Sequence, residues 1–310
     1  MSGEPIPHWP GRLVPLGDHD VYVRSVPPGP GEPALCVHGL EGSSRNWTDL
    51  MELLRPGLAC EAVDLPGFGN SPPRPDGRHS IAALAQTVTT LIGALARGPV
   101  HLIGNSLGGA VCVKIAARRP DLVRTLTLVS PALPDSRPRL DLARFPVLSL
   151  PLVGTRLLRQ LRATPPEHRV ADVIATCFCD PARFPPERFA VEVAELVRRD
   201  GLGYGEEVLV GSVRTLTAQT MHPRSAWRDA ALITAPSLVI FGSHDRLVDP
   251  RLAGRAAHAF AHARIVVLPR TGHVAHMEHP RLVAGEIGAL LDLAGAGVPA
   301  EREFPLTPAG

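Results

Sequence analysis

The sequence lacks any apolar run long enough to cross a membrane, and it carries almost no net charge. Its 310 residues include 32 basic and 30 acidic side chains, a formal net charge of +2. The longest apolar stretch, residues 145–155, contains two prolines, whereas a spanning helix needs about 18 or more apolar residues. The charge balance argues against general nucleic-acid binding, which relies on a basic surface. We therefore expect a globular chain with no membrane span and no nucleic-acid partner.

Cysteine is scarce, and no Cys-x-x-Cys pair occurs. The five cysteines are Cys36, Cys60, Cys112, Cys177 and Cys179. The first three lie in apolar runs and are expected to be buried as small hydrophobic residues. The spacing of the last two is unsuited to a mutual disulfide or a zinc knuckle. The N-terminal residues show neither the basic nor the apolar region of a signal peptide. These features predict a reduced, cytoplasmic protein.

Short apolar runs of strand length alternate with helical patterns along most of the chain. Expected strands are residues 12–16 and 21–26, which form a hairpin, followed by 34–37, 58–63, 100–103, 125–129, 237–241 and 264–268. Expected helices are residues 81–95, 107–119, 251–262 and 281–294. This alternation predicts an α/β fold with a mostly parallel sheet that helices cover on both faces.

The alternation is interrupted between residues 133 and 221. Pro-rich joints divide this interval, and Phe189, Val193, Leu196 and Val197 have the spacing of one helix face. We expect an α/β core made of residues 1–132 and 222–310, with residues 133–221 inserted as a helical cap. An insertion of this length is expected to carry function, most simply as a lid.

The sharpest motif is Gly104-Asn105-Ser106-Leu107-Gly108-Gly109, which directly follows one expected strand and opens a helix. A Gly-x-Ser-x-Gly turn in that context lifts the serine hydroxyl above the ends of the strands. We therefore predict that Ser106 is a nucleophile. Its turn also directs the Leu107 N–H toward an oxyanion, and the turn after residues 34–37 can present the Leu40 N–H opposite. His38 in that turn is interpreted as structural, holding the loop by hydrogen bonds.

A serine nucleophile needs a base. His273 follows the last expected strand and fits this role, with His276 and His279 as rivals in a His-x-x-His-x-x-His run. That spacing could suggest a metal, but no recognisable carboxylate ligand accompanies it. We therefore predict no metal and no cofactor, and we interpret His276 and His279 as polar neighbours on the first turn of the next helix.

The base needs a carboxylate to orient it. Asp245 follows the strand at residues 237–241 and is the predicted acid; the order Ser106, Asp245, His273 is the order typical of a nucleophile elbow. Asp249 fits better as the cap of a helix that begins at Pro250. Asp135 stays open as an acid placed after the strand at residues 125–129.

These motifs resemble the α/β-hydrolase fold, in the group of capped serine hydrolases. The matching parts, between about residues 12 and 294, are His38-Gly39, Trp47, Asp64–Ser71, Gly104–Gly109, Asp245 and Gly272-His273. The resemblance implies an eight-stranded, mostly parallel sheet, an inserted helical cap, and a structural turn at Asp64–Ser71.

Within that group, Asn105-Ser106 and Glu278-His279 resemble the carbon–carbon bond hydrolases. Glu41–Ser44 and Val274 depart from their pattern. Dehalogenases and epoxide hydrolases of this fold place Asp where this chain has Ser106.

The function predicted is cleavage of an ester or thioester of an apolar acyl group through a covalent acyl-enzyme. Carbon–carbon bond hydrolysis, acyl transfer, perhydrolysis and receptor-like binding with slow turnover remain alternatives. The first half of the insertion is apolar and suggests an acyl-binding space, with a lipid contact at its entrance left open. The apolar residues are Leu133, Phe145, Val147, Leu148, Leu150, Leu152, Val153, Leu157, Leu158 and Leu161. The arginines of the insertion are interpreted as a solvated face, with a substrate anion as the alternative: Arg156, Arg159, Arg162, Arg183 and Arg188.

Overall fold

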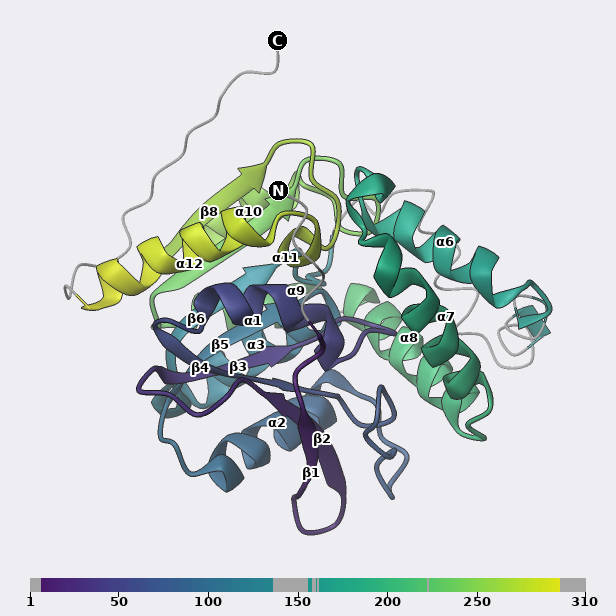
Figure 1. The fold of residues 1–310 in the computed structure, drawn as a ribbon. Coiled ribbons are helices and arrows are strands. Elements are labelled where there is room, and N and C mark those ends of the chain that lie inside the picture. The colour runs from purple at the N-terminus through teal and green to yellow at the C-terminus, as the bar shows by residue number, and fades with distance from the viewer. Residues whose placement is uncertain (1–6, 136–155, 158–159, 161, 222, 296–310) are drawn as a thin grey trace.

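The structure, a computed structural model, describes residues 7–135, 156–157, 160, 162–221 and 223–295. Its centre is an eight-stranded sheet in the order β1-β2-β4-β3-β5-β6-β7-β8 (Figure 1). The strands are β1 (Gly11–Pro15), β2 (Asp20–Ser25), β3 (Glu32–Val37), β4 (Leu58–Val63), β5 (Val100–Asn105), β6 (Val123–Val129), β7 (Ser237–Gly242) and β8 (Ala263–Leu268). The β1–β2 and β2–β4 pairs are antiparallel and the remaining pairs are parallel. The predicted eight-stranded, mostly parallel sheet is thus confirmed.

The parallel strands form where the sequence has continuous apolar runs. Every residue of β4, β5 and β7 is buried, which is expected for strands that have helices on both faces. The strand at residues 100–103 continues to Asn105, so β5 ends directly before Ser106. The strand after it begins at Val123 rather than at residue 125.

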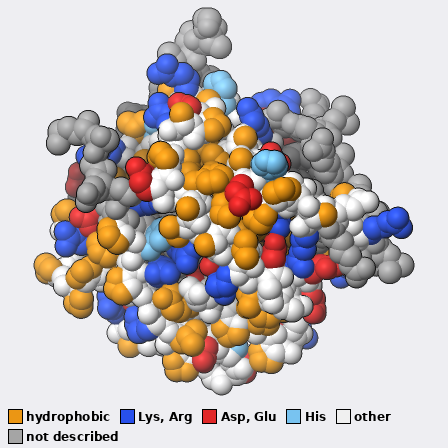
Figure 2. All heavy atoms as spheres, turned by 45° about the vertical axis from the view of Figure 1, so that its right-hand side comes forward, with side chains coloured by type: hydrophobic (Ala, Val, Ile, Leu, Met, Phe, Trp, Pro, Cys, Tyr) orange, Lys and Arg blue, Asp and Glu red, His pale blue; other side chains and the backbone are white. Residues whose placement is uncertain are grey.

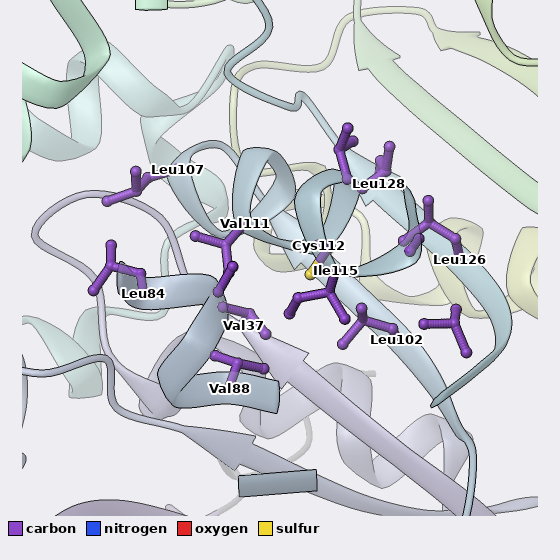
Figure 3. Close-up of a cluster of buried hydrophobic side chains, with 14 of the residues drawn as sticks. Val37, Leu84, Val88, Leu102, Leu107, Val111, Cys112, Ile115, Leu126 and Leu128 are labelled. Atoms are coloured by element: carbon purple, nitrogen blue, oxygen red, sulfur yellow. The ribbon is translucent and has the colours of Figure 1, made fainter. Parts of the chain in front are cut away.

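Two groups of helices cover the two faces of the sheet. The helices of the core are α1 (Thr48–Leu54), α2 (Ile81–Leu95), α3 (Leu107–Arg118), α9 (Pro223–Ala231), α10 (Leu252–Ala259), α11 (Ala275–Glu278) and α12 (Pro280–Gly295). Side chains of α2, α3, α9 and α10 share one apolar cluster with the sheet, and those of α1, α11 and α12 share the other. Figure 3 shows part of the first cluster, in which Leu84 and Val88 of α2 face Val111 of α3.

Helix α2 illustrates how local sequence determines an element. It spans the predicted residues because the Ser80 side chain accepts a hydrogen bond from the Ala83 N–H at 3.1 Å, which satisfies one of the free amides of the first turn. Leu84, Val88 and Leu91 then recur on one buried face. The helix ends where Ala96 adopts φ 53°.

Among the described residues of the interval in which the strand pattern is interrupted, three long α-helices lie between β6 and α9. They are α6 (Pro166–Cys177), α7 (Pro186–Asp200) and α8 (Gly205–Met221), which lie together on one side of the sheet (Figure 1). The predicted apolar face of α7 is wrong in one residue. Phe189, Val193 and Leu196 pack in an apolar cluster of the insert (residues 133–221). Val197 is 51% exposed, because the buried stripe of α7 is narrower than the helix face that the spacing predicts.

The apolar first half of the insertion lies largely outside the described residues, since residues 136–155, 158–159 and 161 are not described. Exposed apolar side chains on the described insert include Val173 of α6 and Val191 of α7. Figure 2 shows the insert's side of the molecule, with apolar and charged side chains interspersed. Scattered apolar residues are normal on protein surfaces, and the lipid contact that the sequence left open gains no support from them. No helix in the described part of the chain is long and apolar enough to span a membrane.

Candidate active site

The strand order changes direction between β3 and β5. The chain runs from β3 to β4 on one side and then crosses to β5 on the other side of β3. Loops that follow β3 and β5 therefore diverge, and open α/β sheets bind ligands at this position. Leu40 follows β3 and Ser106 follows β5, so both predicted groups lie at this end of the sheet, where the strand order changes direction.

Ser106 occupies a strained turn between β5 and α3. Its backbone has φ 54° and ψ −117°, a conformation that costs about 1 to 3 kcal/mol for a residue with a side chain. Two features stabilise this turn. The Ser106 N–H donates to Val129 O at 3.1 Å, and Gly108 lets α3 approach β3. A Cβ at Gly108 would lie 2.2 Å from Val37 O, so only glycine fits there.

His273 and Asp245 form a buried pair. His273 Nδ1 lies 2.9 Å from Asp245 Oδ2. The other oxygen, Oδ1, accepts hydrogen bonds from the Leu247 N–H at 2.8 Å and the Val248 N–H at 2.9 Å. Burial acts to raise the pKa of Asp245, but the charge of His273 and the hydrogen bonds from His273, the Val248 N–H and the Ser130 side chain outweigh it and hold that pKa below its usual value. Asp245 is therefore an ionised acceptor with a fixed orientation.

This pairing determines the tautomer of His273. A carboxylate only accepts, so the proton of the neutral imidazole lies on Nδ1 and Nε2 keeps its lone pair. The backbone of His273 is tied to the serine turn, because the Asn105 amide donates to His273 O at 3.2 Å and to Val129 O at 3.0 Å. Asn105 is buried and directly precedes Ser106. The structure thus joins Asp245 to His273 and links their loop to the Ser106 turn through Asn105.

The loop after β3 packs directly against Ser106. A Cβ at Gly39 would lie 3.0 Å from Ser106 Cβ and 2.9 Å from Asn105 Oδ1. Leu40 is the next residue, so its peptide group is adjacent to the serine. Leu107 is the first residue of α3, and the first N–H groups of a helix lack acceptors within it. Both expected oxyanion donors lie beside the serine turn.

The structural interpretation of His38 is confirmed. The Leu65 N–H donates to His38 Nε2 at 2.9 Å, so Nε2 is an acceptor and the proton must lie on Nδ1, 2.7 Å from Gly39 O. Burial is the main cause that lowers the pKa of His38, which keeps the ring neutral. Both nitrogens are occupied in holding the loop.

The turn at Asp64–Ser71 is likewise structural. Asp64 accepts from the Ser44 N–H at 2.6 Å and the Asn70 N–H at 2.8 Å, and the Ser71 hydroxyl donates to Asp64 O at 2.6 Å. Asp64 thereby ties this turn to η1 (Ser44–Trp47), the short 3₁₀ helix after the Gly39-Leu40 loop.

The three histidines of the His-x-x-His-x-x-His run have separate surroundings. His276 lies on α11 and stacks on Trp47 with ring centroids 4.1 Å apart. Burial lowers its pKa to about 3. His279 follows α11 and lies 3.1 Å from Arg183 Nη1. The expectation that both lie on the first turn of the next long helix is therefore wrong, because His276 belongs to the separate short helix α11 and α12 begins at Pro280, after His279. Among the described residues, no group of three His, Cys, Asp or Glu side chains could hold a metal ion.

The predicted role of Asp249 also needs correction. Helix α10 begins at Leu252 and not at Pro250, and its N-cap residue Arg251 makes no side-chain cap. Asp249 instead accepts from the Arg251 N–H at 2.9 Å and pairs with the Arg251 guanidinium at 2.5 Å. The hydrogen bond and charge of Asp249, with a smaller contribution from Asp135, raise the pKa of Arg251. The carboxylate in contact with His273 is Asp245.

Comparison with known proteins defines the class. A family model described as the alpha/beta hydrolase fold matches residues 33–280, and the chain belongs to this family. It is 26% identical over 265 residues to the dihydrolipoyllysine-residue acetyltransferase component of the acetoin cleaving system of Pseudomonas putida, covering 84% of this chain and 64% of that protein. The chain thus spans less than two thirds of that relative.

Two further similarities show how varied the family is. The chain is 24% identical over 268 residues to 2-hydroxy-6-oxononadienedioate/2-hydroxy-6-oxononatrienedioate hydrolase 1 of Dechloromonas aromatica (strain RCB), covering 85% of this chain and 88% of that one. A haloalkane dehalogenase loop variant from Bradyrhizobium elkanii has a similar structure, with a TM-score of 0.77, 22% identity and coverage of 94% and 99%. The structural likeness shows the fold, and the reaction must be argued from the residues of this chain.

Proposed function

We propose that this chain is a serine hydrolase that cleaves an ester or thioester of an apolar acid. The observation that carries the proposal is the 2.9 Å contact between His273 Nδ1 and Asp245 Oδ2, near a serine in a strained strand-to-helix turn. A serine hydroxyl needs an adjacent base. An imidazole whose Nδ1 faces a buried carboxylate offers Nε2 as that base.

In this mechanism Ser106 Oγ attacks the substrate carbonyl carbon while His273 Nε2 takes the hydroxyl proton. The Leu40 and Leu107 N–H groups donate to the oxyanion of the tetrahedral intermediate. His273 then passes its proton to the leaving alkoxide or thiolate, and the acyl group stays on Ser106. Water attacks the acyl-enzyme, again losing a proton to His273, and the acid is released as the proton returns to Ser106. Asp245 stays ionised and stabilises the imidazolium formed in both halves.

We further propose that residues 133–221 form a cap over this site. One observation supports the boundary near residue 222, and a second supports the position of the insert beside the site. Helix α9 packs on α3, where Asp229 lies 2.5 Å from Lys114 Nζ, so α9 belongs to the core. Helix α6, by contrast, ends against the His273 loop, because the His273 N–H donates to Cys177 O at 2.6 Å. A cap in this position would select the acyl group by its shape and polarity.

Carbon–carbon bond hydrolysis is the second candidate. The similarity to the Dechloromonas aromatica enzyme, by its name a hydrolase of a 2-hydroxy-6-oxononadienedioate and the corresponding trienedioate, favours it. The same serine and histidine would serve either reaction, so the substrate distinguishes the two. Receptor-like binding with slow turnover is a further outcome, which the turnover of simple esters separates from catalysis.

The test is a panel of p-nitrophenyl esters with short, medium and long acyl chains, assayed beside a dienoate ring-fission product. Ser106→Ala should lower kcat by on the order of 10⁶-fold, and a fluorophosphonate should label Ser106 in the wild type. Ser80→Ala is the matched control, since Ser80 caps α2 and its loss should cost about 1 kcal/mol of stability without changing the labelling. Labelling at another serine would overturn the assignment, and a single slow turnover would favour receptor-like binding.

A further inference from the structure

A buried carboxylate outside the proposed triad connects the insert to the loop that carries His273. Glu278 lies at the end of α11 and is only 4% exposed. Its Oε2 accepts from the Gly272 N–H at 2.7 Å and from the Cys179 N–H at 3.1 Å, and its Oε1 accepts from the Asp180 N–H at 2.9 Å. One side chain thus binds three backbone amides from two segments that are about 90 residues apart in the chain.

The two segments are in direct backbone contact. A Cβ at Gly272 would lie 2.3 Å from Cys177 O and 2.6 Å from Cys179 N, so any other residue would push the insert away. On the opposite side, a Cβ at Gly242 would lie 2.1 Å from Gly272 O. Gly272 is therefore enclosed between the end of β7 and the insert.

The insert also holds His273 and the residue after it. The His273 N–H donates to Cys177 O at 2.6 Å. Val274 packs in the apolar cluster of the insert with Phe178, Phe184 and Leu196. The neighbours of His273 on both sides are thus held by the insert, and Glu278 supplies the side-chain hydrogen bonds of that contact.

We propose that Glu278 is a positioning residue: by fastening insert residues 177–180 to Gly272, its carboxylate fixes His273 for proton transfer with Ser106. Catalysis then depends on the position of the insert relative to the loop that carries His273. This inference rests on the proposed function. The physical reason is that proton transfer requires the base within hydrogen-bond reach of the serine, and a displacement of about 1 Å can reduce the rate about 10²-fold.

Two substitutions separate the hydrogen bonds of Glu278 from its volume. Glu278→Leu removes all the acceptors, and kcat should fall about 10²-fold. Glu278→Gln keeps one carbonyl oxygen, which can still accept from the Gly272 and Cys179 N–H groups, so its kcat should fall less. The matched control is Glu195→Leu, because Glu195 is also a buried carboxylate of the insert contact but pairs with Arg198 and Arg45 instead.

The readout distinguishes positioning from a merely structural role. The kcat is expressed per fluorophosphonate-titrated serine, so loss of folded protein does not count. We expect kcat to fall with little change in KM, and amide exchange at residues 179–180 and 272–273 to increase together in the Glu278 variants and not in Glu195→Leu. A folded Glu278→Leu with wild-type kcat per site and wild-type exchange would overturn the proposal.

A wild-type measurement keeps the proposal falsifiable if both Glu278 variants fail to fold. In hydrogen exchange of the wild-type protein across a urea series, the amides of residues 179–180 and 272–273 should open with the same free energy, because the Glu278 carboxylate holds both segments. Different opening free energies would contradict the link. Failure of the proposed function looks different, because it would show as unimpaired turnover in Ser106→Ala whatever the Glu278 variants do.

Discussion

Asp245→Asn is the most informative single change, because its effect can be worked out from the contacts of the two carboxylate oxygens. Oδ1 accepts two backbone N–H groups, from Leu247 and Val248, and Oδ2 faces His273 Nδ1. An asparagine has one oxygen and one NH₂ group for these two positions. If its oxygen faced His273, the NH₂ group would face the Leu247 and Val248 N–H donors, and neither would have an acceptor. Each buried donor without an acceptor costs about 1 to 3 kcal/mol of stability.

The amide of the variant should therefore turn its oxygen toward the backbone and its NH₂ group toward His273. The imidazole must then accept at Nδ1, so its proton moves to Nε2, the atom that should take the proton of Ser106. The same substitution in chymotrypsin-type serine proteases lowers kcat about 10⁴-fold, equivalent to about 5 kcal/mol of barrier. We expect a loss of that size here, with the protein still folded.

The assay compares three variants at pH 7 on the best ester of the panel. Asp249→Asn is the control, since Asp249 is buried in the same loop but pairs with Arg251; it should keep its kcat and lose about 1 kcal/mol of stability or less. Asp135→Asn tests the acid position left open by the sequence. Near-normal kcat for Asp245→Asn, with collapse for Asp135→Asn, would refute this reasoning and move the acid to the segment after β6.

Two further predictions concern the histidines. His273→Ala should be nearly as damaging to kcat as Ser106→Ala on the same ester, whereas His276→Ala and His279→Ala should cost much less; loss of wild-type activity in a chelator would instead indicate a metal. His276→Phe tests the pH dependence of stability. Burial lowers the pKa of His276 from an ordinary 6.5 to about 3 in the folded protein. As pH falls, the unfolded chain therefore binds the proton first, and the stability of the wild type declines below pH 6.5. His276→Phe keeps a ring against Trp47 but cannot titrate. In urea unfolding, its free energy of unfolding should therefore fall between pH 7 and pH 5 by about 2 kcal/mol less than that of the wild type. Equal losses in both proteins would contradict this prediction.

Local sequence alone determined most of the elements and the serine turn. The apolar runs of the parallel strands, the Ser80 cap of α2 and the glycines around Ser106 act within a few residues of one another, so their consequences can be predicted without the fold. Helix α1 was missed because its seven residues, Thr48–Leu54, are too few to show a clear period. Helix α10 was predicted too long at both ends, since helix ends depend on contacts more than on the repeat.

Only the tertiary structure decided which polar groups meet. The sequence favours His273 as the base because it follows the last strand, but only the fold pairs it with Asp245 and buries His276 on Trp47. The contact of Glu278 with Cys179 and Asp180 joins residues about 100 positions apart, and no local pattern predicts that contact. The physical reason is that periodicity and capping report how a segment meets its own neighbours, whereas strand order and the seating of the insert arise from packing over the whole chain.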